Sequence, residues 1–189
     1  MTSLRTLTLS GAALLCATFA SAQTNWALRH QGPLQGDFLW SVTDGNEGAV
    51  AVGDGGKILH SADKGATWVQ RNSGTTDWIV AVTYGNGRYV AVGQSGLVLT
   101  SSNGITWTRI ASVGTTARLN NVLYAQDRFV AVGEGGATIV SLDGGATWSA
   151  TTSNAGANWL HGLAFGAGRW IATGQGGTTI ASSDGINWA

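Results

Sequence analysis

A short segment that ends in tryptophan recurs four times and constrains the fold more than any other feature of the chain. Its full form reads Ser-x-Asp-x-Gly-x-Thr-Trp, at residues 61–68 and 141–148, and shorter forms occupy residues 101–107 and 182–188. The closing tryptophans stand at positions 68, 107, 148 and 188. A period of about 40 residues, with strand-like residues between the tryptophans, is typical of β-propellers and related arrays.

Between the tryptophans, each unit contains runs that predict four short strands. The units begin near residues 38, 78, 118 and 159, and each opens with an apolar run. A second strand follows, reading Val-Ala-Val-Gly in three units and Ile-Ala-Thr-Gly in the last, and the fourth strand starts at the tryptophan. Runs this short, rich in Val, Ile, Thr and Trp and bounded by glycine, favour antiparallel strands. No helical periodicity is visible after the N-terminal segment.

We therefore predict an all-β fold, a β-propeller of four-stranded antiparallel blades with about four blades present. The predicted blades cover residues of about 37–76, 77–116, 117–157 and 158–189. A β-helix is the alternative, but it would have shorter coils and no four-strand unit. Two apolar columns that stay fixed between units are predicted to form the core, namely Leu39, Ile79, Leu119, Leu160 and Val42, Val82, Val122, Leu163.

The first 22 residues predict a signal peptide. Arg5 gives a positive start, residues 7–19 are mostly apolar, and the small residues 20–22 form a cleavage site that leaves Gln23 as the mature N-terminus. A membrane anchor is the alternative, but the apolar run is short and interrupted. We expect an exported protein, periplasmic or extracellular, with no direct membrane insertion after cleavage.

Cysteine content and charge limit the possible partners. The only cysteine, Cys16, lies in the signal peptide, so the mature chain cannot form a disulfide. A lipid anchor at this cysteine would require a small residue where Leu15 stands. Of ten basic residues Arg5 is removed with the signal peptide, which leaves nine against ten acidic residues. A net charge this close to zero argues against nucleic acid or an anionic membrane surface as the partner.

The two ends of the repeat region leave ring closure open. Residues 23–36 are predicted to supply a closing strand, because the Asn-Trp-Ala at residues 25–27 matches residues 187–189. Such a strand could complete the last blade of a small ring. Alternatively the sequence is a truncated or partial ring, since it stops two residues into its last strand. An open array would expose apolar blade faces, through which the chain could associate with further blades or with itself.

The repeated turn resembles the Asp-box of the sialidase-type, or BNR, repeat. The units around it, with Val-Ala-Val-Gly followed by the box, resemble the photosystem II stability and assembly-factor type of propeller found in exported bacterial proteins. The resemblance covers almost all of residues 24–189 and implies a propeller fold. It implies little about function, because sialidases, other glycosidases, binding proteins and scaffolds share this repeat.

The Asp-box itself has a structural explanation. An aspartate in a hairpin can accept hydrogen bonds from the backbone of its own turn, and asparagine can replace it because the bond needs an oxygen and no charge. The tryptophan would bury apolar area between blades. Metal binding or acid catalysis is the alternative, but single carboxylates on separate blades do not converge. The structural box residues are Asp63, Asn103, Asp143, Asp184, Trp68, Trp107, Trp148 and Trp188.

Columns that vary between units mark the candidate ligand-binding surface. One column opens each unit and contains Phe38, Trp78, Arg118 and Trp159. The other lies in the turn between the second and third strands and contains Asp54, Gln94, Glu134 and Gln175. Strand counting places both columns on the face opposite the Asp-boxes, where aromatics beside acids and amides can bind a sugar or a peptide. Alternatively these side chains only cap the blades and their turns.

No catalytic or metal site can be assigned. The repeated arginines Arg88, Arg128 and Arg169 are suggestive of a sialidase cluster, but they are predicted in different blades on the Asp-box face. The histidines lack metal-ligand spacing, and no Ser-His-Asp arrangement is recognisable. We predict a non-catalytic binding or scaffold module for a protein or glycan, without a cofactor. The alternatives are a sialidase-like glycoside hydrolase whose catalytic residues lie in blades outside this sequence, and an assembly factor for a membrane complex.

Overall fold

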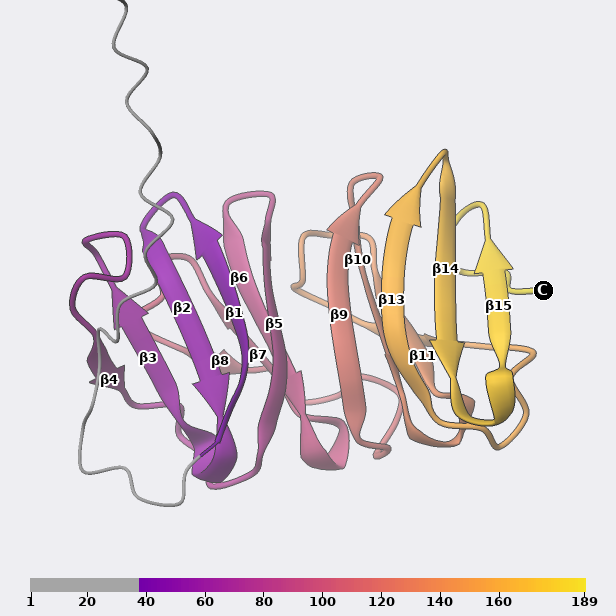
Figure 1. Cartoon of the computed structure of the whole chain (residues 1–189), viewed down its shortest axis with the longest axis horizontal. Helices are drawn as coiled ribbons and strands as arrows, with labels where there is room; N and C mark the ends of the chain where they lie inside the picture. The colour runs from indigo at the N-terminus through magenta and orange to yellow at the C-terminus, as the bar shows by residue number, and fades with distance from the viewer. Residues whose placement is uncertain (1–37) are drawn as a thin grey trace, which may run out of the picture.

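A computed structural model describes residues 38–189 of the chain. The predicted signal peptide (1–22) and closing strand (23–36) lie outside the described residues. Four antiparallel sheets, three of four strands and one of three, stand side by side along one row (Figure 1). This arrangement confirms the predicted all-β propeller architecture, in the form of an open array of four blades.

Each blade repeats one strand order, in which consecutive strands are neighbours. Blade one contains β1 (Leu39–Gly45), β2 (Gly48–Gly53), β3 (Ile58–Ser61) and β4 (Val69–Arg71). Blade two contains β5 (Ile79–Gly85), β6 (Arg88–Gly93), β7 (Val98–Ser101) and β8 (Thr108–Arg109). Blade three contains β9 (Leu119–Ala125), β10 (Arg128–Gly133), β11 (Thr138–Ser141) and β12 (Ser149–Thr151). Blade four contains β13 (Leu160–Gly166), β14 (Arg169–Gly174) and β15 (Thr179–Ser182).

The connections within a blade are equally regular. A short 3-10 turn joins the second and third strands of every blade, at η1 (Asp54–Gly56), η2 (Gln94–Gly96), η3 (Glu134–Gly136) and η4 (Gln175–Gly177). In blade four, Ala189 exchanges two main-chain hydrogen bonds with Ala181, at 2.8 and 2.9 Å. These bonds place Ala189 where the other blades have their fourth strand.

A one-residue irregularity near the start of each first strand sets which side chains reach the core. In blade one Leu39 pairs with Gly53 and Ser41 with Val52, so that Trp40 has no partner in the register. Such a bulge lets two residues three positions apart point to one side of the sheet, where regular alternation would separate them. The two apolar columns predicted for the core, at positions 39 and 42 and their equivalents, therefore share one face.

We call this side of each blade its leading face and the opposite side its trailing face. Three clusters of buried side chains fill the space between consecutive blades, each combining a trailing face with the leading face that follows. Between blades one and two, for example, Val50 and Val52 of β2 pack against Ile79 and Leu99. Close packing of these apolar faces is the main stabilisation that such a repeat array has.

The core prediction holds between blades and fails at the start of the array. Ile79, Leu119 and Leu160 are fully buried, but Leu39 in the same column is 47% exposed. In the second column Val42 is 64% exposed and Val82 only 6%. The reason is positional, because no blade of the described chain lies on the leading face of blade one (Figure 1).

Candidate functional site

The four repeated turns that resemble Asp-boxes, for which we keep that name, are closed by hydrogen bonds from their own residues. In blade one the Asp63 carboxylate accepts from Thr67 N at 2.8 Å, from Thr67 Oγ1 at 2.6 Å and from Ser61 Oγ at 2.8 Å. The box around Asp143 has the same three hydrogen bonds, and their lengths agree with those of the first box to within 0.1 Å. In blade two Asn103 Oδ1 accepts from the backbone N–H groups of residues 105 and 106, both at 2.9 Å.

These hydrogen bonds hold the box carboxylates in the ionised form. The side-chain and backbone donors of Thr67 lower the pKa of Asp63 to about 2. Thr147 lowers the pKa of Asp143 to about 2 in the same way. Backbone donation from Asn187 and Ile186 keeps the pKa of Asp184 well below its usual range. A general acid needs a raised pKa, so this environment suits a structural turn and opposes acid catalysis.

At the opposite end of the blades, the structure brings the two variable columns together. In every blade the backbone N–H of the turn residue donates to the carbonyl oxygen of the residue that opens the blade. These bonds are Asp54 to Phe38 at 3.0 Å, Gln94 to Trp78 at 3.0 Å, Glu134 to Arg118 at 2.9 Å and Gln175 to Trp159 at 2.8 Å. Antiparallel pairing puts this end of each blade opposite its Asp-box.

The polar column holds the aromatic column in place. Gln94 Oε1 accepts from the backbone N–H of Trp78 at 2.9 Å, and Gln175 Oε1 accepts from that of Trp159 at 3.3 Å. The remaining two members bond to side chains. Asp54 accepts from the indole N–H of Trp40, and Glu134 pairs with Arg118 at 3.0 Å. Each of these polar groups is thus engaged within its own blade.

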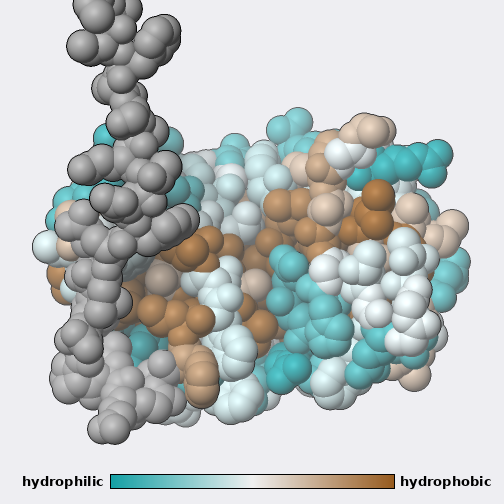
Figure 2. Space-filling model, viewed as in Figure 1, coloured by the Kyte–Doolittle hydropathy of each residue, from teal (hydrophilic) through white to brown (hydrophobic). Residues whose placement is uncertain are grey.

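The aromatic side chains remain exposed. Phe38 is 63% exposed, Trp40 50%, Trp78 41% and Trp159 37%. Their rings form a row across blades one and two, with centroids 5.6 Å apart from Phe38 to Trp40 and 6.4 Å from Trp40 to Trp78. We call these four residues, together with Arg118, the aromatic rim. Phe38 and Trp78 directly precede β1 and β5, and Trp40 lies in β1. Figure 2 shows hydrophobic residues gathered over these two strands.

On blades three and four, the rim contains a contact between a cation and an aromatic ring. The guanidinium carbon of Arg118 lies 5.6 Å from the ring centroid of Trp159, within the range of a cation–π interaction. His161 lies 6.3 Å beyond, ring centroid to ring centroid. The column that opens each blade therefore forms a row of rings on blades one and two and a cation–aromatic pair on blades three and four.

Trp40 belongs to this surface although the sequence did not single it out. It occupies the bulged position of β1, and His161 occupies the same position of β13. A bulge re-aims its extra residue, which simple alternation along a strand does not anticipate. The signal was present as a third variable column, since positions 40, 80, 120 and 161 hold Trp, Val, Asn and His.

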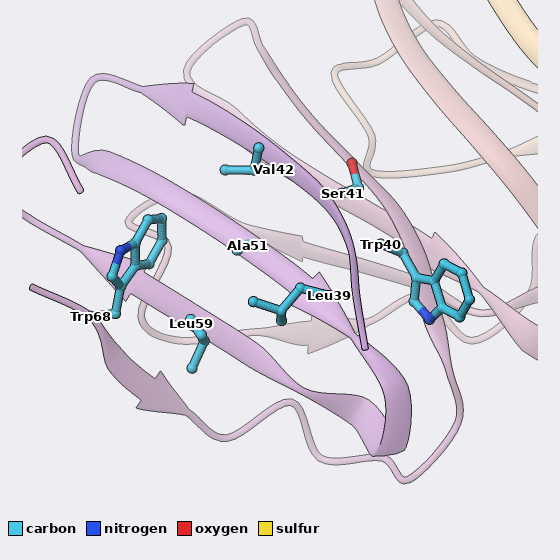
Figure 3. Close-up of a pocket in the computed structure, with 7 residues that line it drawn as sticks. All are labelled: Leu39, Trp40, Ser41, Val42, Ala51, Leu59 and Trp68. Carbon is cyan, nitrogen blue, oxygen red and sulfur yellow. The ribbon is translucent and has the colours of Figure 1, made fainter. Parts of the chain in front are cut away.

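A hollow that adjoins the aromatic rim at Trp40 lies on the leading face of blade one (Figure 3). Its volume is about 640 Å³, and it is lined by Leu39, Trp40, Ser41, Val42, Ala51, Leu59 and Trp68. Figure 3 shows Trp68, Leu59 and Leu39 on one side of the sheet and Trp40 pointing away from them. The same positions in the other blades form the buried interfaces between blades. Within residues 38–189, no blade covers this hollow.

The repeated arginines do not form a cluster around a common point. Arg128 of blade three reaches the box of blade four, where its Nη1 donates to the carbonyl oxygen of Asp184 at 2.6 Å. Within residues 38–189, no group of three His, Cys, Asp or Glu side chains is arranged to hold a metal ion. That part of the chain also contains no helix long and apolar enough to cross a membrane.

Comparison with known proteins shows the fold and leaves the family unassigned. No protein-family profile and no curated protein matches the sequence. Two solved structures of YCF48 are similar. One, from Cyanidioschyzon merolae, has 17% identity and a TM-score of 0.61, and covers 81% of this chain and 55% of its own. The other, YCF48 bound to D1 peptide, has 21% identity and a TM-score of 0.59, with 87% and 56% covered.

Two other propellers have comparable similarity. The computationally designed Ika4 protein has 12% identity and a TM-score of 0.62, and covers 78% of this chain and 91% of its own. The Niastella koreensis GH74 enzyme has 19% identity and a TM-score of 0.56, with 80% and 24% covered. Identities this low support the fold alone. The chain spans a little over half the length of the YCF48 chains.

Proposed function

We propose that the chain is an exported, non-catalytic propeller module that binds a segment of another protein through the aromatic rim. The observation that carries this proposal is a row of exposed aromatic rings, Phe38, Trp40 and Trp78, on a rigid scaffold. Solvent-exposed aromatic side chains in a contiguous patch are typical of interaction surfaces. The export part of the proposal rests on the predicted signal peptide.

The chemistry of the rim favours a protein segment over a glycan. A sugar needs polar groups to receive and donate its hydroxyl hydrogen bonds. The polar groups beside the rings, such as Asp54 and Gln94, already bond to Trp40 and Trp78. The exposed faces of Phe38, Trp40 and Trp78 provide apolar surface, to which apolar peptide side chains are suited. Among the similar structures, YCF48 is bound to a peptide, which supports the same kind of partner here.

Several observations support a non-catalytic role. Asp63 and Asp143 have lowered pKa values, whereas glycoside hydrolysis needs one carboxylic acid with a raised pKa. Glu134, at the rim end of blade three, forms an ion pair with Arg118. The similarity to the GH74 enzyme keeps a glycosidase as the second candidate, since it shares the blade architecture. An assembly factor for a membrane complex would be a special case of the protein-binding role.

The test of the binding proposal is a screen followed by substitution in the rim. The mature protein is screened against a displayed library of linear peptides and against a glycan array. Selected binders are then titrated calorimetrically against the wild type and the Trp40→Ala, Trp78→Ala and Trp159→Ala variants. Because large aromatic side chains dominate binding energies, we expect a loss of affinity of about tenfold or more for at least Trp40→Ala and Trp78→Ala.

A matched control comes from the Asp-box end of the array. Leu142 is 60% exposed in the box turn of blade three, at the end of the blades opposite the rim. Leu142→Ala should leave the affinity unchanged. Equal affinity in the wild type and all three tryptophan variants would place the binding surface elsewhere. Binding to glycans alone, lost in the same variants, would retain the rim as the site and exclude the protein partner.

Catalysis is tested separately. Fluorogenic sialosides and β-glycosides are incubated with the purified protein, and release of the fluorophore is followed over hours. We expect no release above that of a boiled sample. Turnover by the native protein would overturn the non-catalytic assignment and favour the glycosidase candidate.

A further inference from the structure

The two ends of the array carry the two halves of one interface. Blade one presents a leading face, with Leu39 and Val42 exposed. Blade four presents a trailing face, on which Ile171 is 41% exposed. The residues equivalent to Ile171 in the earlier blades are Val50, Val90 and Val130, and all three are fully buried against the next blade.

The Asp-box of blade one has the glycine that allows close contact between blades elsewhere in the array. A Cβ atom added to Gly104 would lie 2.8 Å from His60 of the preceding blade, and one added to Gly185 would lie 2.7 Å from Val130. The absence of a side chain there lets two blades approach closely. Gly65 is the same residue of the first box, and a Cβ added to it would meet only Trp68 of its own box, at 3.7 Å.

Blade four has the arginine that, in the earlier blades, contacts the Asp-box of the next blade. Arg128 of blade three donates to the Asp184 carbonyl oxygen in the next blade, and Arg88 of blade two lies against Gly145 of the blade after it. Arg169 is the equivalent arginine of blade four, and it is exposed. The hairpin glycines repeat this pattern, because an added Cβ on Gly85 would meet Tyr124 of the next blade and one on Gly166 would meet nothing.

Charge at the two ends is also complementary. In blades two, three and four the leading face carries an aromatic residue near the end of its first strand, which is Tyr84, Tyr124 or Phe165. Blade one has Asp44 at this position. The trailing face of blade four brings Arg169 to the same end of its sheet. An acidic group on one end and a basic group on the other attract each other and disfavour the association of two like ends.

We propose that a second copy of this chain covers these surfaces, so that blade four of each copy packs against blade one of the other. Such a head-to-tail contact closes when the two copies complete the ring. Two arrays of four blades give eight blades, within the range of about 4–8 found in propellers, whereas three copies would exceed it. In this assembly Arg169 of one copy meets the Asp63 box and Asp44 of the other.

The ring proposal rests on the leading face of blade one and the trailing face of blade four, so it does not depend on the proposed binding function, although Trp40 of the rim borders that leading face. The first measurement is the mass of the purified mature protein by light scattering and native mass spectrometry over a dilution series. We expect a species of two chains that dissociates to one chain on dilution. A single-chain mass at every concentration, or a series of species larger than two chains, would overturn the closed ring.

Two substitutions each block one end. Val42→Asp places a charge on the leading face of blade one, and Ile171→Asp does so on the trailing face of blade four. Both side chains are exposed in the single chain, so each variant should fold, which circular dichroism and thermal unfolding would verify. We expect each variant alone to be a single chain. Arg169→Ala should weaken the wild-type association by about tenfold.

Mixing the two blocked variants distinguishes a head-to-tail contact from contact between like ends. The Val42→Asp chain keeps a normal trailing face and the Ile171→Asp chain keeps a normal leading face, so an equimolar mixture should form a hetero-pair through one intact interface. Leu142→Asp, on neither face, is the control and should pair like the wild type. Pairing of either blocked variant with itself, or no pairing in the mixture at concentrations where the wild type pairs, would overturn the arrangement.

Discussion

The phenol hydroxyl of Tyr89 in blade two donates a hydrogen bond of 2.6 Å to the carbonyl oxygen of Gly48 in blade one. The Tyr89 side chain is fully buried, and its ring lies 4.6 Å from that of Tyr84, centroid to centroid. In blade three the equivalent residue is Phe129, which packs in the same way against Tyr124 at 4.7 Å without a hydroxyl. The interface between blades one and two therefore has a hydrogen bond at this position, and the interface between blades two and three does not.

Removing this hydroxyl should destabilise the protein without disturbing its packing. For Tyr89→Phe we expect a loss of about 1 kcal/mol in the free energy of unfolding, because the carbonyl oxygen of Gly48 loses its buried donor. Urea denaturation followed by tryptophan fluorescence measures the change. Tyr84→Phe is the matched control, since no hydrogen bond of the Tyr84 hydroxyl is present among the described residues, and it should be close to neutral. Equal effects of the two substitutions would contradict the assignment.

Two adjacent glycines in η3 should respond differently to the same substitution. Gly135 and Gly136 both have positive φ, at 60° and 69°. Ser95 occupies the equivalent of Gly135 in blade two with φ of 55°, so Gly135→Ser should cost only about 1 kcal/mol. A Cβ on Gly136 would lie 2.5 Å from the Gly156 carbonyl oxygen, so Gly136→Ser should cost roughly 1–3 kcal/mol more. Thermal or urea unfolding of both variants measures the difference, and equal losses would mean that the loop yields freely.

The Asp-boxes should make the protein sensitive to acid in a defined range. The pKa values of Asp63 and Asp143 are lowered from 3.8 to about 2 in the folded chain. A group whose pKa is lowered on folding stabilises the protein above its unfolded pKa, and this stabilisation is lost as the pH falls through the folded value. We therefore expect the melting temperature to decrease between about pH 4 and pH 2.

Asparagine substitution supplies the control for this acid sensitivity. Asn103 shows that an amide oxygen can accept the same backbone hydrogen bonds. A variant with asparagine at Asp63, Asp143 and Asp184 should fold and show a flatter dependence of melting temperature on pH over this range. The same slope in the variant and the wild type would assign the acid sensitivity to other groups.

Val42 and Val82 occupy equivalent positions on the leading faces of blades one and two, and comparing them tests which of these faces is buried. Val82 is 6% exposed in blade two and Val42 is 64% exposed in blade one. Val82→Ala removes two buried methyl groups and should lower the free energy of unfolding by about 2 kcal/mol. Val42→Ala should change it by less than about 0.5 kcal/mol when measured on the single chain at high dilution. A loss as large for Val42→Ala would show that this side chain is covered within one chain.

Several properties of the candidate site could be derived from position in the repeat. Columns that vary between units identified Trp78 and Trp159, and strand counting placed them with Gln94 and Gln175 at the end opposite the Asp-boxes. The contacts of the polar column could not be derived this way, because they depend on side-chain rotamers and on the path of the turn. Trp40 was missed because a bulge changes the alternation of β1 at that residue. Whether the rim binds a ligand stays a prediction.

By itself the sequence determined the blade architecture, since a period of about 40 residues with strand-like runs has few folded solutions. It also determined the closure of the Asp-box turns, because these hydrogen bonds are local and repeat wherever the motif repeats. Only the tertiary structure decided which copies of a repeated residue are buried. Leu39 and Leu119 are equivalent in sequence, but one is 47% exposed and the other fully buried. The physical reason is that burial depends on a neighbouring blade, and a repeat pattern is the same whether or not that neighbour is present.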